Sequence, residues 1–242
     1  MTTRIVLWAV PRAVGTAFER VFVERDDTFV AHEVFMPCHY YSASRASSRY
    51  DGEVEARPEF DYRNIREKLD RSDTQPVLFV KEIAFHMQGI EDDDYWSTFR
   101  HTFILRDPRV SVPSLYKLMP DLTFDEAGFA AMSRWFRLAT ERFGQQPVVV
   151  NGEKFRTQPA AVLKAFCGQV AIPFQDTTTF TTTRSIPEWS RWRTWHEEAL
   201  TSTHIFQPPL RSSDIDLPDH VEDIIERSMP YYDELNRHAI DV

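Results

Sequence analysis

The chain passes repeatedly from a short apolar run into a polar turn and then into a helix-like pattern. Residues 4–10 are apolar or β-branched at nearly every position, and residues 16–25 place apolar side chains on neighbouring helical stripes. Strands that alternate with helices are typical of a mostly parallel sheet covered by helices. We expect strands at 4–10, 28–35, 76–84, 101–107 and 147–155, and helices at 16–25, 64–69, from 114 onward, 124–143, 159–170 and 217–235, the last bent at Pro230.

This alternation predicts one α/β domain over residues 1–242, with a mostly parallel sheet flanked by helices. A chain of 242 residues can bury a substantial core, and 42% hydrophobic and 27% charged residues are typical of globular proteins. Two segments lack a regular period. We expect the Ser- and Arg-rich residues 42–58 to be a mobile loop or lid, and residues 176–195 to be an extended loop that returns to the site.

The charge balance and the cysteine content limit which binding partners and which cellular compartment we expect. Lys and Arg total 28 against 37 Asp and Glu, a net charge of −9, so no nucleic-acid partner is expected and an anion site must concentrate positive charge locally. Cys38 and Cys167 have no metal-ligand spacing, and no metal is expected. With no signal peptide and no long apolar span, the sequence predicts a cytoplasmic, reduced protein without a membrane partner.

Two turns carry groups suited to an anion. After the first strand, Arg12 supplies a forked cation, Gly15 allows close backbone approach, and Thr16 adds a hydroxyl at a helix start. After a later strand, Arg106 is followed eight residues on by Ser114, and both turns are expected at the carboxyl edge of the sheet, where ligands bind. The first turn is not a Walker A loop, since it lacks the first glycine and the lysine. Taken alone, it is equally compatible with an ordinary strand–helix connection.

The order of these and later motifs along the chain narrows the choice of ligand and protein family. "VPRAVGTAFER" resembles the 5′-phosphosulfate loop of sulfotransferases that use 3′-phosphoadenosine 5′-phosphosulfate (PAPS), and "ILRDPRVSVPSLYKL" resembles their 3′-phosphate segment. "VVVNGEKFRTQPAAVLKAFCG" and "MPYYDEL" are similar to later segments of that family, so the resemblance covers most of the chain and is strongest to bacterial small-molecule enzymes. It implies a P-loop-like turn after the first strand, PAPS as donor and 3′-phosphoadenosine 5′-phosphate (PAP) as product.

The resemblance also implies a donor site. Arg12, Gly15 and Thr16 would hold the 5′-phosphosulfate, and Arg106 and Ser114 the 3′-phosphate. The turn departs from the family pattern in having Ala13 and Val14 where a serine and a glycine are usual, and Ala17 where an aromatic residue often follows. An alternative for Arg106 is a plain surface ion pair with Asp107.

A general base and a cation near the leaving oxygen are needed for sulfuryl transfer, and "LFVKEIAFHMQ" is the first place to expect them. The resemblance implies that Lys81 stabilises the bridging oxygen and that His86 or Glu82 is the base. The alternative is a solvated Lys–Glu strand end and a structural histidine.

A second candidate pair is His32 and Glu33, which the family resemblance also places near the site; the alternative is a strand-end histidine with its partner carboxylate. The late stretch "TTTRSIPEWSRWRTW" lies where the family has a basic loop over the 3′-phosphate of the donor. The resemblance implies that an arginine of this stretch contacts that phosphate, with Arg193 as the first candidate and Arg191 as the second. Alternatively, its tryptophans pack against the last helix and its arginines face water.

We therefore predict a PAPS-dependent sulfotransferase that acts on a hydroxyl or amine of a small, aromatic or hydrophobic acceptor. Two alternatives stay open: a PAP- or PAPS-binding protein without transfer activity, and a P-loop phosphotransferase or kinase. Aromatic residues that would line the acceptor site are Tyr40, Tyr41, Phe85, Trp96 and Tyr116. The oligomeric state does not follow from the sequence.

Overall fold

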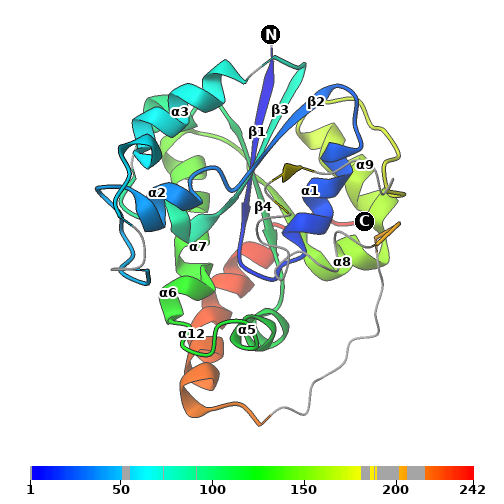
Figure 1. Cartoon of the computed structure of the whole chain (residues 1–242). Coiled ribbons are helices and arrows are strands. Elements are labelled where there is room, and N and C mark those ends of the chain that lie inside the picture. Colours follow the sequence, from blue (N-terminus) through cyan, green and yellow to red (C-terminus); the bar gives the residue numbers. More distant parts are fainter. Residues whose placement is uncertain are drawn as a thin grey trace.

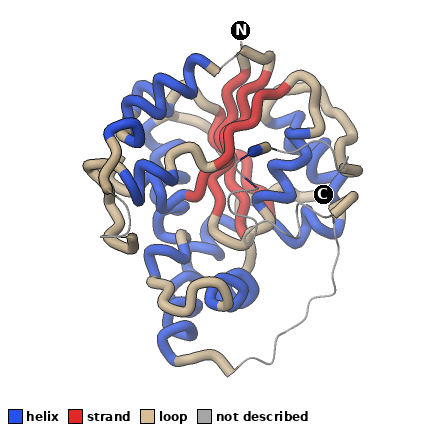
Figure 2. Tube along the Cα trace, viewed as in Figure 1, coloured by secondary structure: helices blue, strands red, loops and turns tan. Residues whose placement is uncertain are grey.

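A five-stranded, all-parallel sheet in the order β2-β3-β1-β4-β5 forms the centre of the computed structural model (Figures 1 and 2). The structure describes residues 2–50, 55–72, 74–90, 92–180, 186, 187, 189, 202–205 and 216–242. The strands are β1 (Thr3–Ala9), β2 (Thr28–His32), β3 (Val77–Ile83), β4 (Arg100–Leu105) and β5 (Val148–Asn151). The single α/β domain with a parallel sheet is as the sequence predicts.

Helices and helical turns follow the strands and cover both faces of the sheet (Figure 2). They are α1 (Gly15–Val23), α2 (Met36–Tyr41), η1 (Pro58–Phe60), α3 (Tyr62–Arg71), η2 (Ala84–Met87), α4 (Asp93–Trp96), α5 (Pro108–Tyr116), α6 (Phe124–Ala127), α7 (Phe129–Arg137), the π-helical turn η3 (Leu138–Arg142), α8 (Gly152–Thr157), α9 (Pro159–Gln169) and α12 (Asp219–Asn236). In the described part of the chain, no helix combines the length and apolar character needed to span a membrane.

Several predicted elements have different bounds, and for three of them the structure gives a local reason. The helix expected from Ser114 begins at Pro108, because the Asp107 side chain caps it by accepting from the backbone N–H of Arg109 at 2.8 Å. The strand expected to reach residue 155 ends at Asn151, whose side chain caps α8. The helix expected over 124–143 is interrupted at Gly128, which has a left-handed φ of 83°.

The two expected loops are only partly described. Residues 42–50 and 55–57 form no helix or strand, and 51–54 lie outside the described residues. Of residues 176–195, the structure describes 176–180, 186, 187 and 189. An isolated bridge joins Thr179 to His204.

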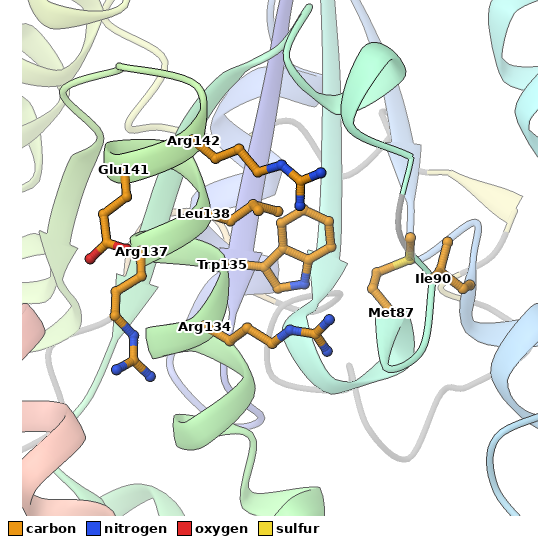
Figure 3. Close-up of a pocket in the computed structure, with 8 residues that line it drawn as sticks. All are labelled: Met87, Ile90, Arg134, Trp135, Arg137, Leu138, Glu141 and Arg142. Carbon is orange, nitrogen blue, oxygen red and sulfur yellow. The ribbon is translucent and has the colours of Figure 1, made fainter.

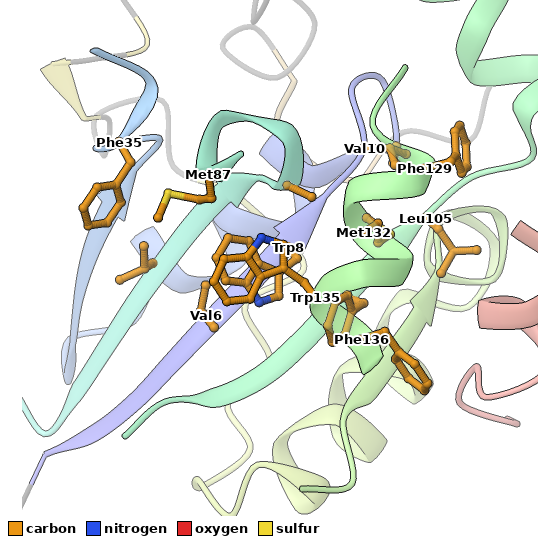
Figure 4. Packing of buried hydrophobic residues seen from close by; sticks show 14 of the residues in the cluster. Val6, Trp8, Val10, Phe35, Met87, Leu105, Phe129, Met132, Trp135 and Phe136 are labelled. Carbon is orange, nitrogen blue, oxygen red and sulfur yellow. The ribbon is translucent and has the colours of Figure 1, made fainter. Parts of the chain in front are cut away.

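Alternate side chains of β1 supply two separate cores. Val6, Trp8 and Val10 belong to the core beneath α3, α7 and α12, whereas Ile5, Leu7 and Ala9 face α1, α8 and α9. In the first core, the Trp8 ring stacks on Trp135 with centroids 4.2 Å apart (Figure 4). Both cysteines are buried and free, so Cys167 is a core residue as expected. The strand is therefore fixed from both sides, and the turn that follows it starts from a rigid support.

His101 is a buried histidine of this core whose two ring nitrogens are both used. Nδ1 accepts a hydrogen bond from Trp8 Nε1 at 3.0 Å, and Nε2 lies 2.9 Å from the carbonyl oxygen of Trp96. This pairing requires the neutral ring with its proton on Nε2. Burial lowers the pKa of His101 to about 4, although its hydrogen bond to Trp96 acts in the opposite direction.

We expect acid to weaken the fold through His101. Because its pKa is lower in the folded than in the unfolded chain, the stabilisation is complete above the unfolded value of 6.5 and is lost as the pH falls from 6.5 towards 4. The difference of about 2.5 pKa units corresponds to roughly 3 kcal/mol of unfolding free energy. Urea unfolding at pH 7 and pH 5 should show about 2 kcal/mol of this loss, since pH 5 is still above the folded pKa. NMR titration of the His101 ring gives the pKa itself, and a ring that titrates near pH 6.5 would contradict the prediction.

Candidate active site

The carboxyl ends of three adjacent strands meet around the turn that follows β1. Ala9, the last residue of β1, is in register with Ile83 of β3 on one side and Ile104 of β4 on the other. The β1–α1 turn (residues 10–14) is therefore flanked on one side by the end of β3, which carries Lys81, and by η2 after it, which carries His86. On the other side it is flanked by the segment after β4, which carries Arg106. All the strands are parallel, so these groups share one edge of the sheet (Figure 1).

The β1–α1 turn has an unusual backbone. Arg12 and Val14 have φ values of 63° and 60°, so the left-handed conformations fall on these residues and not on Gly15. Val14 is the N-cap of α1 and makes no side-chain capping hydrogen bond, and the first turn of the helix holds no acidic residue. The positive end of the helix is thus left without a carboxylate of its own, which suits an anion.

Glycines let neighbouring chain segments approach this turn closely. A Cβ on Gly152 would lie 3.1 Å from the carbonyl oxygen of Ala13, 3.1 Å from Cγ2 of Val14 and 3.2 Å from the carbonyl oxygen of Leu105. A Cβ on Gly15 would lie 3.3 Å from Cε of Lys81. Gly152 allows the turn to pack against β4 and α8, and Gly15 allows the Lys81 side chain to lie alongside the start of α1.

The two predicted anion segments come together. Arg12 donates from Nε to Oγ of Ser114 at 3.0 Å, across 102 positions of sequence. Arg106 donates from Nε to Oε1 of Glu153 at 2.5 Å, and Arg156 also pairs with that carboxylate. Two guanidinium groups share one carboxylate, so this side of the site keeps a net positive charge. The expected alternative partner of Arg106, Asp107, instead pairs with Arg109.

His86 is oriented by Glu82. Its Nδ1 lies 2.9 Å from Oε1 of Glu82. The same carboxylate accepts the backbone N–H of Ile83 at Oε1 and that of Phe35 at Oε2, each at 2.9 Å, and is fully buried. Glu82 thus has its oxygens engaged within the protein, whereas no described residue occupies Nε2 of His86. The pair fixes the ring and leaves one nitrogen for another group.

A chain of alternating charges leads from Lys81 into the core. Lys81 Nζ pairs with Glu33, whose Oε1 lies 3.7 Å from Nε2 of His32. His32 Nδ1 lies 2.7 Å from Oε2 of Glu19, which also accepts from Nε1 of Trp189 at 3.0 Å. Glu19 on α1 thereby joins the end of β2 to the Trp189 side chain.

These contacts set the charge of His32 and Glu33. Burial works against a charged His32, but Glu19, Glu33 and the hydrogen bond to Glu19 outweigh it and raise the pKa of His32. Burial likewise opposes a charged Glu33, but Lys81, His32 and His86 together hold the pKa of Glu33 well below its usual range. These contacts favour the charged forms of both His32 and Glu33, and each side chain is already engaged by protein groups, which makes both less suited to remove an acceptor proton.

Several site residues were missed from the sequence. Glu19 and Glu153 contact predicted residues only across long sequence distances, and His39 lies against His86 with ring centroids 5.5 Å apart. Trp189 is fully buried and contacts Glu19 and His32. Arg191 and Arg193 lie outside the described residues.

The five aromatic residues expected near the acceptor divide between different places. Tyr40 and Phe85 contact His86, with ring centroids 5.6 and 4.6 Å apart, and Tyr41 contacts Tyr40. Trp96 belongs instead to the core around Trp8, and Tyr116 lies against His220 of α12.

A separate pocket of about 280 Å³ lies between η2 and the α7–η3 segment (Figure 3). It is lined by Met87, Ile90, Arg134, Trp135, Arg137, Leu138, Glu141 and Arg142, none of which is a predicted site residue. Arg142 at its rim is already paired with Asp93. In the described part of the chain, no group of three or more His, Cys, Asp or Glu side chains is arranged to hold a metal ion.

Comparisons with known proteins give one family match and a distant relative. A family model described as "Sulfotransferase domain" matches residues 3–239. Branched-chain-amino-acid aminotransferase-like protein 2 of Arabidopsis thaliana is 23% identical over 232 residues, which cover 96% of this chain but 41% of that relative, so the chain spans less than half its length.

Two solved structures share the fold. The sulfotransferase domain of the Synechococcus PCC 7002 olefin synthase has a TM-score of 0.57 at 13% identity, covering 100% of this chain and 96% of that one. A sulfotransferase from Alicyclobacillus acidocaldarius has a TM-score of 0.55 at 11% identity, covering 100% and 98%.

Proposed function

The chain belongs to the sulfotransferase domain family, and from this we propose that it moves a sulfuryl group from PAPS to a hydroxyl or amine of a small, aromatic or hydrophobic acceptor. The observation that carries the proposal is the meeting of three strand ends. Arg12 contacts Ser114, and Lys81 lies alongside Gly15. Cationic and hydroxyl groups for two phosphate ends thus lie at the same edge of the sheet as a candidate base.

The residues present fit a nucleotide with an anion at each end of its ribose. On the 5′ side we place Arg12, Gly15 and Thr16, with the backbone of Ala13 and Val14, at the uncapped start of α1. On the 3′ side we place Arg106 and Ser114, where Arg156 offsets the charge of Glu153. Arg191 and Arg193 stay predictions for this side.

We assign the general base to His86. Of the four candidates, Glu82 is engaged with two backbone N–H groups and the ring it orients, while His32 is held by Glu19 and Glu33 by Lys81. His86 keeps Nε2 for the acceptor proton, and Glu82 is its positioning residue. PAPS supplies the sulfuryl group, whose bond to the phosphate oxygen breaks as the acceptor oxygen or nitrogen bonds to sulfur. Lys81 offsets the negative charge left on that phosphate oxygen.

A thermal-shift comparison of PAP with ATP tests the donor. A ligand that binds only the folded chain at 100 times its Kd adds about 2.7 kcal/mol. For a chain of this size, that amount corresponds to a rise in Tm of roughly 5–10 °C. We expect this rise with PAP and little change with ATP, and Ser114→Ala should reduce it.

The other outcomes of this experiment are also informative. An equal shift with ATP would favour a phosphotransferase on this scaffold. A PAP-selective shift without transfer from labelled PAPS to any member of an acceptor library would favour a nucleotide-binding protein that has no transfer activity. The absence of any response to PAP would contradict the proposed donor.

A further inference from the structure

Aromatic side chains form one flank of His86, and we call His39, Tyr40, Tyr50 and Phe85 the aromatic wall. Phe85 and Tyr40 contact the His86 ring directly, and Tyr50 extends the wall outward with its ring 5.1 Å from Tyr40. His39 packs edge-on against Tyr40 and Phe85. The wall therefore combines α2, η2 and the irregular segment 42–50, which are not held together by strand pairing.

The wall carries little charge. Burial and the neighbouring His86 lower the pKa of His39 to about 4, so its ring is neutral at pH 7. Burial most strongly raises the pKa of the Tyr40 phenol, and Glu126 acts in the same direction, so the phenol stays protonated. An acceptor that lies against this wall meets aromatic surface and neutral polar groups.

Arg49 fastens the outer end of the wall to α6. Its Nε and Nη2 donate to the two oxygens of Glu126 at 2.5 and 2.7 Å, and Nη1 donates to both oxygens of Asp121 at 2.8 and 2.9 Å. Glu126 is itself held by the backbone N–H and hydroxyl of Thr123. Such a two-pronged contact depends on the planar fork of arginine, which lysine cannot reproduce.

We call Arg49 with its partners Glu126 and Asp121 the clamp. The helix that carries Glu126, α6, ends next to the donor side of the site. Gly128, at the junction of α6 and α7, packs so closely that a Cβ there would lie 3.3 Å from Cδ of Pro11 and 3.6 Å from Cδ1 of Phe85. Through these contacts Arg49 connects α6, which ends beside the β1–α1 turn, to Tyr50 and the rest of the aromatic wall next to His86. With Glu126 and Asp121, the clamp carries one positive and two negative groups, so its edge is unfavourable for a second anion.

We propose that Arg49 is a positioning and specificity residue, which holds the aromatic wall beside His86 and so favours an uncharged phenol or aromatic alcohol over a carboxylated one. The inference rests on the proposed function and names the acceptor class for the same site. The clamp joins residues 77 positions apart in sequence and has no role in the donor contacts described above.

Binding of 2-naphthol and of 6-hydroxy-2-naphthoate to the PAP-saturated protein, measured by calorimetry, tests the inference without requiring turnover. We expect the wild type to bind 2-naphthol more tightly than 6-hydroxy-2-naphthoate. Arg49→Lys should raise the Kd of 2-naphthol about tenfold, as expected for loss of a charge-assisted contact, and should bring the Kd values of the two naphthols closer together. The Kd of PAP should change less than twofold. Arg71→Lys is the matched control, at an exposed ion pair with Glu67 on α3, and it should leave the Kd values of both naphthols and of PAP unchanged.

Glu126→Gln opens the clamp from the other side and should reproduce the effect, which provides a second variant if Arg49→Lys does not fold. A wild type that binds neither naphthol, or both equally, would overturn the inference. So would an Arg49→Lys variant with unchanged preference, or one that loses PAP by the same factor. If the wild type binds 2-naphthol selectively but transfers no sulfuryl group to any acceptor, the proposed function fails and the role of Arg49 in acceptor binding stands.

Discussion

Replacing His86 with asparagine is expected to lower kcat about 10²- to 10⁴-fold while PAP affinity stays within about twofold. The amide of the shorter side chain retains a donor that can reach Glu82, but the second ring nitrogen, which we assign to the acceptor proton, is lost. Steady-state transfer from PAPS to a phenol gives kcat, and calorimetry gives the affinity for PAP.

Two controls accompany the His86 variant. His220→Asn changes an exposed histidine of α12 and should leave both quantities unaltered. The Kd of PAP reports whether the site is still formed. If His86→Asn kept more than about a tenth of wild-type kcat with normal PAP binding, another group would have to be the base.

Replacing Gly152 with alanine is expected to reduce kcat/KM for PAPS about 100-fold. The new methyl group would lie 3.1 to 3.2 Å from two carbonyl oxygens, those of Ala13 and Leu105, so backbone must move. Both carbonyls belong to segments that we assign to the donor, and misplacing a positioning group by about 1 Å commonly costs a factor near 10².

Gly168→Ala is a closely matched comparison for this experiment. Gly168 is also helical, in α9, but a Cβ there would meet nothing within 4 Å. This variant should raise the unfolding free energy by about 0.5–1 kcal/mol and leave kinetics unchanged. Equal kinetics for the two variants would show that the contact at Gly152 does not position the β1–α1 turn.

The fold was largely predictable because β1 and β3 are buried on both faces and therefore read as continuous apolar runs. The start of α5 was also visible in principle, since Asp107 before Pro108 is a capping signal. It was missed because Pro113 was taken to exclude a helix, although a short helix tolerates one lost hydrogen bond. The break at Gly128 depends on close packing against Pro11 and Phe85, which no local pattern reveals.

The sequence predicted that residues of separate segments meet at the sheet edge, but it did not predict their contacts, and their roles stay predictions. Arg12 and Ser114 were expected to serve one nucleotide, and they do lie in contact, so this geometry agrees with a shared role. The choice between His86 and Glu82 required the structure, because only the three-dimensional contacts show which oxygens and nitrogens are already engaged. Glu19 gave no sequence signal, since it bonds to His32 and Trp189 through tertiary contacts alone.

The strand order has a consequence for how such a protein can diversify. β1 lies at the centre, so the segments after β2 and β3 reach its turn from one side and those after β4 and β5 from the other. On our assignment, the residues beside the acceptor lie in 28–99 and are supported through Arg49 by Asp121 and Glu126, whereas Arg106 and Ser114 contact the nucleotide from the β4 side. Substitutions in the segments after β2 and β3 can therefore change the acceptor while the nucleotide contacts after β4 are kept, provided that the close approach of Lys81 to Gly15 is preserved.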